Sequence, residues 1–166
     1  MKFRVVINGV SQTMASFLQV ERGIIDMNKL GAWNQVIRTF HKIEKRIFDT
    51  EGGSGKHGRW QPVGAAYAVQ KFRRWRSVRI LRASDDMMKS LTSQSAHSFI
   101  DKQPQELAIG TTLFYAGVHQ TGPPQTKYAR RSIDLTADDE KALVDPLKQK
   151  VRQLIMNARL RDVRGF

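Results

Sequence analysis

The sequence contains no cysteine. This absence excludes disulfide bonds, thiolate metal sites and cysteine nucleophiles. The sequence also lacks any apolar run near the ~18 residues that a membrane-spanning helix needs. Its start, MKFRVVINGV, has too short an apolar run for a signal peptide and no small-residue cleavage site, which predicts a protein that stays in the cytoplasm.

Arrangements of residues that carry out catalysis are missing as well. The segment Gly53-Ser54-Gly55 lacks the flanking strand and helix of a nucleophile elbow. The pair Gly55-Lys56 does not fit a phosphate-binding loop, because Thr50 stands where such a loop needs Gly and His57 stands where it needs Ser or Thr. None of the four histidines has a second ligand at metal-binding spacing. We predict a protein that is not an enzyme and uses no metal or cofactor.

The sequence has an excess of positive charge. Lys and Arg number 28 against 15 Asp and Glu, which gives a net charge of +13. Such an excess indicates a polyanionic partner, an acidic protein surface, or burial of the charges in an assembly. The 166 residues, 40% of them apolar, predict one domain with a modest core.

The spacing of apolar residues predicts several helices. The most regular pattern begins near Asn28, and its stripe is expected to form the core: Leu30, Trp33, Val36, Ile37, Phe40, Ile43, Ile47 and Phe48. Other helices are expected after Ser11 or Thr13, from Pro62 through Phe72, from a cap at Ser84 to Leu91, over 113–119, and from Thr136 onward. Pro146 is expected to kink or split the last helix.

Three segments have the composition of strands. Residues 3–8 are rich in β-branched side chains, and residues 90–100 are expected to pair with residues 105–109 through a turn at 101–104. The adjacent Asp85 and Asp86 suit the first turn of the short helix that follows Ser84. Adjacent residues on a helix point about 100° apart, so these aspartates are not expected to share one metal ion.

A basic and aromatic segment runs from Lys71 to Arg76. Cations interleaved with aromatic rings are typical of surfaces that bind single-stranded nucleic acid. No second aromatic platform follows the segment. We therefore favour a solvated basic segment whose rings pack against the body of the protein.

The stretch from Glu106 to Leu135 has the most distinctive order of elements. A short strand leads into a helix that is expected to press Phe114 and Val118 inward. Gly122-Pro123-Pro124 should stop that helix, because proline has no amide hydrogen and glycine allows backbone angles that other residues avoid. Tyr128–Arg131 is expected to be an exposed basic segment. This order suits a loop that is held against a partner.

The chain from Phe48 to Leu135 resembles the phage virion morphogenesis family, which includes tail completion proteins of contractile- and long-tailed phages and of Mu-like prophages. The resemblance is carried by short motifs in order: Phe48, Glu51-Gly52, the glycine-rich loop to Gly58, Trp60-Gln61-Pro62, Lys71, Ile80-Leu81, Ala83-Ser84, Met88, Ser90, Ile109-Gly110-Thr111, Tyr115-Ala116, His119-Gln120, Gly122, Ala129-Arg130 and Leu135-Thr136-Ala137-Asp138-Asp139.

The resemblance implies an α+β fold, with a small antiparallel sheet packed with long amphipathic helices. It implies a structural protein of the virion neck or of the head-proximal tail end, assembled in the host cytoplasm. Copies would form a ring, six-fold or twelve-fold, that completes the tail and contacts other neck, connector, tail-tube or terminator proteins. We expect one domain over 1–166, with flexible loops at 51–59 and 121–128 and a basic tail at 157–166 that order on assembly.

Nine residues are candidates for contacts with partners or with DNA in the lumen: Trp60, Arg73, Arg74, Trp75, Arg76, Tyr115, His119, Arg130 and Arg131. Reversing the charges of Arg130 and Arg131 is expected to block head-tail joining in a monomer that still folds. Two other classes stay open. One is a basic nucleic-acid-binding module, and the other is a hydrolase that uses Asp85, Asp86 or His119.

Overall fold

The computed structural model describes residues 5–6, 26–104, 106–122 and 128–163. These residues form the α+β fold that the sequence predicted, with helices around a small antiparallel sheet. The helix expected after Ser11 or Thr13 lies outside the described residues. No described helix is long and apolar enough to cross a membrane.

Helix α2 (Ala32–Asp49) is the centre of the core. Its predicted stripe is confirmed, with Trp33, Phe40 and Phe48 almost completely buried. Burying a large apolar side chain contributes roughly 1.5–3 kcal/mol, so this one helix supplies much of the core's stabilisation. The helix begins later than the sequence predicted, because residues 27–31 form a turn that ends at Gly31 with a φ of 68°.

The sheet has the order β1-β3-β2, with both pairs antiparallel. Strand β1 is Val5–Val6, β2 is Ser98–Lys102 and β3 is Leu107–Thr111. The predicted hairpin is confirmed, although Ser90 is helical and the turn lies nearer Gln103, whose N–H donates to the Glu106 carbonyl at 2.8 Å. All five residues of the central strand β3 are buried.

Two short helices cover one end of the sheet. Helix α4 (Asp86–Thr92) has Asp85 at its N-cap position, so the predicted cap at Ser84 was wrong; the Ser84 hydroxyl donates to Asp86 instead. Helix α5 (Phe114–Thr121) buries Ala116 and leaves Phe114 70% exposed. The prediction that Phe114 points inward was wrong, because the small Ala116 is the residue that faces the core.

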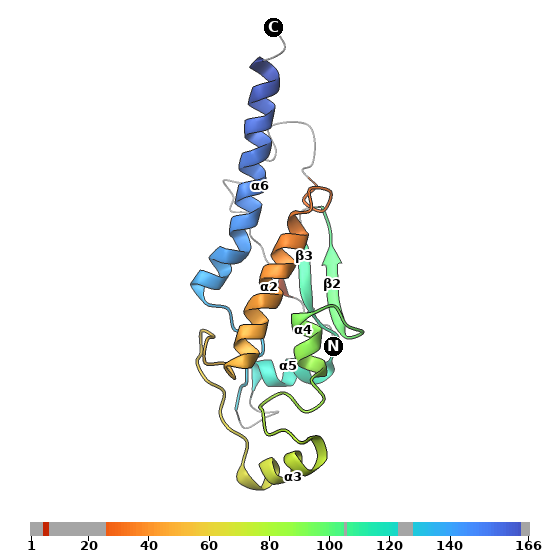
Figure 1. Cartoon of the computed structure of the whole chain (residues 1–166), viewed down its shortest axis with the longest axis vertical. Helices are drawn as coiled ribbons and strands as arrows, with labels where there is room; N and C mark the ends of the chain where they lie inside the picture. Colours follow the sequence, from red (N-terminus) through yellow and green to blue (C-terminus); the bar gives the residue numbers. More distant parts are fainter. Residues whose placement is uncertain (1–4, 7–25, 105, 123–127, 164–166) are drawn as a thin grey trace.

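Helix α6 (Ala137–Val163) packs along α2. Its start is a capping box, in which Thr136 and Asp139 bond each other's backbone N–H groups. The helix is continuous through Pro146 rather than split, although its first turns slant relative to the rest in Figure 1. It continues through Val163, so residues 157–163 of the predicted tail are helical.

The molecule is elongated, and Figure 1 shows α2 between α6 and the sheet. The outer half of α6 extends beyond the sheet at one end. Helix α3 (Ala65–Trp75) stands at the opposite end, apart from the other helices. It begins three residues after Pro62, so the prediction that Pro62 lies in its first turn was wrong.

The turn after α2 is joined to the segment before α6 at two points. At the first, the Trp60 indole packs edge-on against Phe48 at 5.4 Å and donates to the Arg131 carbonyl at 2.9 Å. A Cβ added at Gly52 would lie 2.6 Å from the Trp60 ring, so only glycine fits beneath the indole. Trp60 is 5% exposed, so it is a core residue and not the partner contact that the sequence suggested.

The second point is the buried carboxylate of Asp134. It accepts hydrogen bonds from the backbone N–H of His57 at 2.8 Å and from the His57 ring, while the Asp134 carbonyl accepts from the Lys56 N–H. The sequence predicted a flexible loop at 51–59. The structure instead shows a turn that is hydrogen-bonded to a distant part of the chain, at a place where Gly55 lies directly against Asp134.

Two carboxyl groups, those of Asp139 and Glu44, are also buried where α2 meets α6. One guanidinium nitrogen of Arg46 donates to both oxygens of Asp139, at 2.7 and 2.8 Å. Although burial alone would raise the pKa of Asp139, hydrogen bonds from Thr136 and Arg46 lower it. Glu44 is fully buried, and neither of its carboxylate oxygens has a hydrogen-bond partner among the described residues.

Burial raises the pKa of Glu44 well above its usual range, and the nearby carboxylates of Asp139 and Asp134 raise it further. The folded state therefore favours the protonated, uncharged form of Glu44. Because the folded state holds this proton more tightly than the unfolded state, Glu44 makes folding less favourable as the pH rises above about 4.5, the ordinary pKa of the group.

The contact of Gly55 with Asp134 predicts the effect of adding one methyl group. A Cβ at Gly55 would lie 2.5 Å from an Asp134 oxygen, whereas a Cβ at Gly64 meets nothing within 4 Å. We expect Gly55→Ala to lower the free energy of unfolding by roughly 1–3 kcal/mol and Gly64→Ala to change it by about 0.5 kcal/mol or less. Urea denaturation measures both, and equal effects would contradict the packing described for this turn.

The burial of Glu44 predicts a pH-dependent gain from Glu44→Gln, which is uncharged at every pH. We expect this variant to be more stable than the wild type by a margin that grows as the pH rises from about 4.5 through neutrality. Thermal unfolding across this pH range measures the margin. The exposed Glu140→Gln serves as the control, and a margin for Glu44→Gln that is independent of pH would refute the uncharged state.

Candidate functional site

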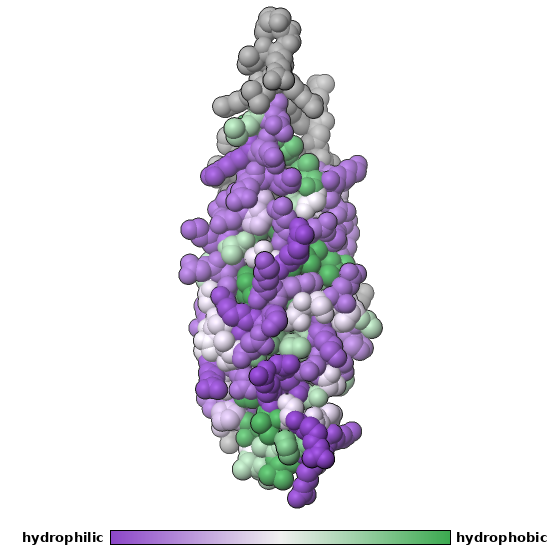
Figure 2. Space-filling model, in the orientation of Figure 1, coloured by the Kyte–Doolittle hydropathy of each residue, from purple (hydrophilic) through white to green (hydrophobic). Residues whose placement is uncertain are grey.

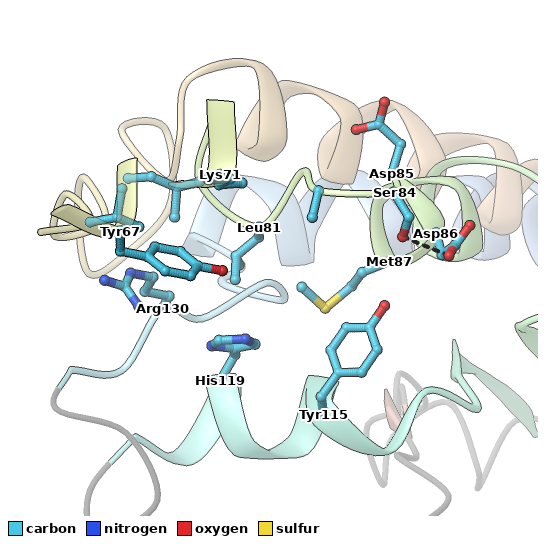
Figure 3. A pocket seen from close by; sticks show the side chains of 13 residues that line it. Tyr67, Lys71, Leu81, Ser84, Asp85, Asp86, Met87, Tyr115, His119 and Arg130 are labelled. Atoms are coloured by element: carbon cyan, nitrogen blue, oxygen red, sulfur yellow. Dashed lines mark hydrogen bonds between the residues drawn. The ribbon is translucent and has the colours of Figure 1, made fainter. Parts of the chain in front are cut away.

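A cleft of about 460 Å³ lies between α3, the start of α4 and α5. Its wall brings together three of the nine candidate contact residues, Tyr115, His119 and Arg130. Figure 3 shows Tyr115 and His119 projecting from α5 into the cleft, toward Met87 and Leu81 on the opposite wall. The family-like motifs around α5 and Arg130 therefore meet at one place on the structure.

The titratable groups that α5 presents to the cleft are held in their uncharged forms. Burial lowers the pKa of His119, and the positive charge of Arg130 lowers it further. Burial also raises the pKa of Tyr115, as does the charge of Asp86. On the α5 side the cleft thus has a neutral, partly apolar wall, while Lys71, Arg130, Asp85 and Asp86 supply the charged groups of its lining.

The cleft does not assemble a catalytic group. Asp85 accepts a hydrogen bond from Arg82 at 2.8 Å, and Asp86 accepts one from Ser84 at 2.6 Å, so the two carboxylates have separate partners. Figure 3 places His119 away from both, with Met87 and Tyr115 nearer to them. Among the described residues, no three His, Cys, Asp or Glu residues are grouped to hold a metal ion. This arrangement gives the hydrolase alternative no support.

Arg130 and Arg131 are half-buried, so the prediction of an exposed basic segment was wrong for them. The Arg130 guanidinium donates to the carbonyls of Gln61 and Pro62, at 3.0 and 3.4 Å. The backbone N–H of Arg130 donates to the backbone carbonyl of His119. Arg131 supplies the carbonyl that Trp60 binds. Reversing the charge of Arg130 would remove these side-chain hydrogen bonds, so the double substitution does not isolate a surface contact.

The basic side chains of α3 lie on the surface. Arg73, Arg74 and Arg76 are exposed, and none forms an ion pair with a described residue. Arg74 stacks over the half-buried Trp75 ring at 4.6 Å, and Arg76 lies 5.9 Å from the Phe72 ring, which is 49% exposed. The prediction that these rings pack against the body was therefore wrong for Phe72.

Helix α3 buries one side chain, which binds the segment that returns from the helix. Lys71 is 3% exposed, the only residue of the helix that is buried, and its ammonium group donates to the Arg79 carbonyl. Burial lowers the pKa of Lys71, while the Glu51 carboxylate opposes that shift. Glu51 also accepts a hydrogen bond from the Ile80 N–H, which fixes the chain on its return from α3.

We call residues 65–79, which comprise α3 and the segment that returns from it, the α3 lobe. The lobe carries four of the exposed large apolar side chains, Tyr67, Val69, Phe72 and Val78. Sequence reasoning missed this exposed apolar surface, because the spacing of Ala65, Val69 and Phe72 also fits a core helix. A signal was present in the charges: residues 52–84 contain eight Lys and Arg but no Asp or Glu.

The hydrogen bond between Lys71 and Arg79 predicts how the lobe can be loosened. Lys71→Met keeps an apolar side chain but removes the hydrogen bond to Arg79, so amide hydrogens in residues 65–79 should exchange about tenfold faster. Those of α2 and β3 should exchange as in the wild type. The neighbouring exposed substitution Gln70→Met is the control. Unchanged exchange in the lobe, or faster exchange throughout the protein, would show that this hydrogen bond does not specifically stabilise the lobe.

Comparison with known proteins identifies a family whose model covers most of the chain. The model of the phage virion morphogenesis family matches residues 12–152, which include strands β2 and β3, the cleft and the α3 lobe. No curated protein and no solved structure matches the chain. Because the family match spans most of the sequence, the chain belongs to the phage virion morphogenesis family.

Proposed function

We propose that this protein is a structural component of the phage neck or of the head-proximal end of the tail. Copies form a ring, six-fold or twelve-fold, that completes the tail and lets it join a filled head. The family supports an assembly role rather than a catalytic one. In this proposal the protein is assembled in the host cytoplasm and remains in the virion, in contact with connector, tail-tube or terminator proteins.

The observation that carries the proposal is the presence of two separate uncovered surfaces. The α3 lobe exposes apolar side chains at one end of the molecule, and α6 exposes Ile155 and Met156 at the other, 39% and 65% exposed. Figure 2 shows hydrophobic side chains gathered at the α3 end, beside strongly hydrophilic ones. A subunit that has neighbours on different sides needs two unlike contact surfaces, whereas an isolated soluble protein gains nothing from either.

A basic nucleic-acid-binding module is the second candidate function. The exposed Arg73, Arg74 and Arg76 beside the rings of Phe72 and Trp75 favour it, because such a surface contacts phosphates and bases. Within a ring, the same surface would face DNA in the lumen. The exposed valines of the lobe favour a protein partner instead, because they offer neither charge nor a ring.

Disabling this gene alone in the parent phage or prophage tests the proposal. We expect electron microscopy to show filled heads beside unattached tails, because the component that joins them is missing. Tails of irregular length would place the protein at the tail terminus. Re-expression of the intact gene is the control and should restore joined particles. Joined, intact virions without the protein would refute the proposed function.

A further inference from the structure

The α3 lobe has an apolar stripe that faces solvent. Ala65, Val69 and Phe72 recur at spacings of four and three, and all three are exposed. Lys71 points to a different side of the helix and is buried against the body. An amphipathic helix whose apolar side is uncovered has the form of a helix that docks into the groove of another protein.

The charged side chains of the lobe are all basic. Arg73, Arg74, Arg76 and Arg79 are exposed, and no described carboxylate lies within ion-pair distance of them. Because residues 52–84 contain no acidic residue, the lobe itself supplies no negative charge to offset these cations. A complementary surface must therefore supply negative charge around an apolar centre.

From this geometry we infer that the α3 lobe docks into an apolar groove bordered by Asp and Glu on a different protein of the virion. The inference rests on the proposed function in taking the chain for a virion component. The inference goes beyond that function in two ways. It names the surface that contacts a different protein, and it specifies the chemistry of that protein's groove.

A second copy of this chain fits the lobe poorly. Outside residues 52–84 the chain still holds twenty Lys and Arg against fifteen Asp and Glu. Several of those acids already have partners: Asp139 binds Arg46, Asp49 binds Lys45, Asp85 binds Arg82 and Asp134 binds His57. A neighbouring copy thus offers a basic surface to a basic lobe, which is unfavourable.

DNA also fits the lobe poorly. The stripe includes Val69, which has no charge for phosphate and no planar face for a base. Val78, 53% exposed, adds a second aliphatic side chain to the lobe. The Trp75 ring, which could stack on a base, is half-buried and already has Arg74 over one face. Burying aliphatic surface is favourable only against another apolar surface. Of the two partners compared, a protein offers such a surface and DNA does not.

Photo-crosslinking in the assembled virion tests the inference. The crosslinking residue p-benzoylphenylalanine is placed at Val69 in one variant and at Phe72 in another, with the exposed Lys42 of α2 as the matched control position. Irradiated virions are digested, and the attached peptides are sequenced. We expect both lobe positions, and not Lys42, to attach to one protein other than this chain, at a peptide that contains Asp or Glu.

Attachment of the lobe to a second copy of this chain, or to DNA, would overturn the inference and leave the proposed function standing. Absence of the protein from virions would overturn the proposed function instead. For the case in which neither position crosslinks, Val69→Ser combined with Phe72→Ser decides the matter. We expect this variant to fold and to lower the yield of infectious particles roughly a hundredfold. A wild-type yield would overturn the inference.

Discussion

The structure depends on the junction between the turn after α2 and the segment that leads into α6. On its apolar side, the Trp60 indole packs on Phe48 and donates a hydrogen bond to the Arg131 carbonyl. On its polar side, the Asp134 carboxylate accepts hydrogen bonds from the backbone N–H and the ring of His57. Both contacts join parts of the chain more than seventy residues apart, and both leave room for glycine alone at the point of approach. This junction fixes the base from which α3 projects.

A rigid base with a projection that buries little of its own surface is a physical arrangement suited to assembly. The core side of α2 and the sheet hold the body together, and the Arg46–Asp139 pair ties α6 to it. The α3 lobe contributes one fully buried side chain, Lys71, and exposes four large apolar ones, Tyr67, Val69, Phe72 and Val78. Surface that gives little to the stability of the monomer is available to stabilise a complex.

The sequence predicted the α+β fold and the α2 stripe because these follow from spacing and composition. It could not predict which way a short helix turns: Phe114 is large and apolar, yet Ala116 faces the core. Trp60 and Arg130 belonged to family-like motifs and so suggested contacts, but both serve the junction and its neighbourhood. Their roles depend on carbonyl groups about seventy residues away, which no local pattern reveals. The exposure of α3 was equally hidden, because an amphipathic helix has the same spacing whether its partner lies in the same chain or in another.

The most direct test of this account is electron microscopy of the intact virion at a resolution that traces helices. The account predicts copies of this chain in a ring at the head-tail junction, with the body of each copy beside its neighbour and the α3 lobe buried against a different, acidic component. A joined virion in which the chain is absent from that junction, or in which the α3 lobe faces solvent, would contradict it.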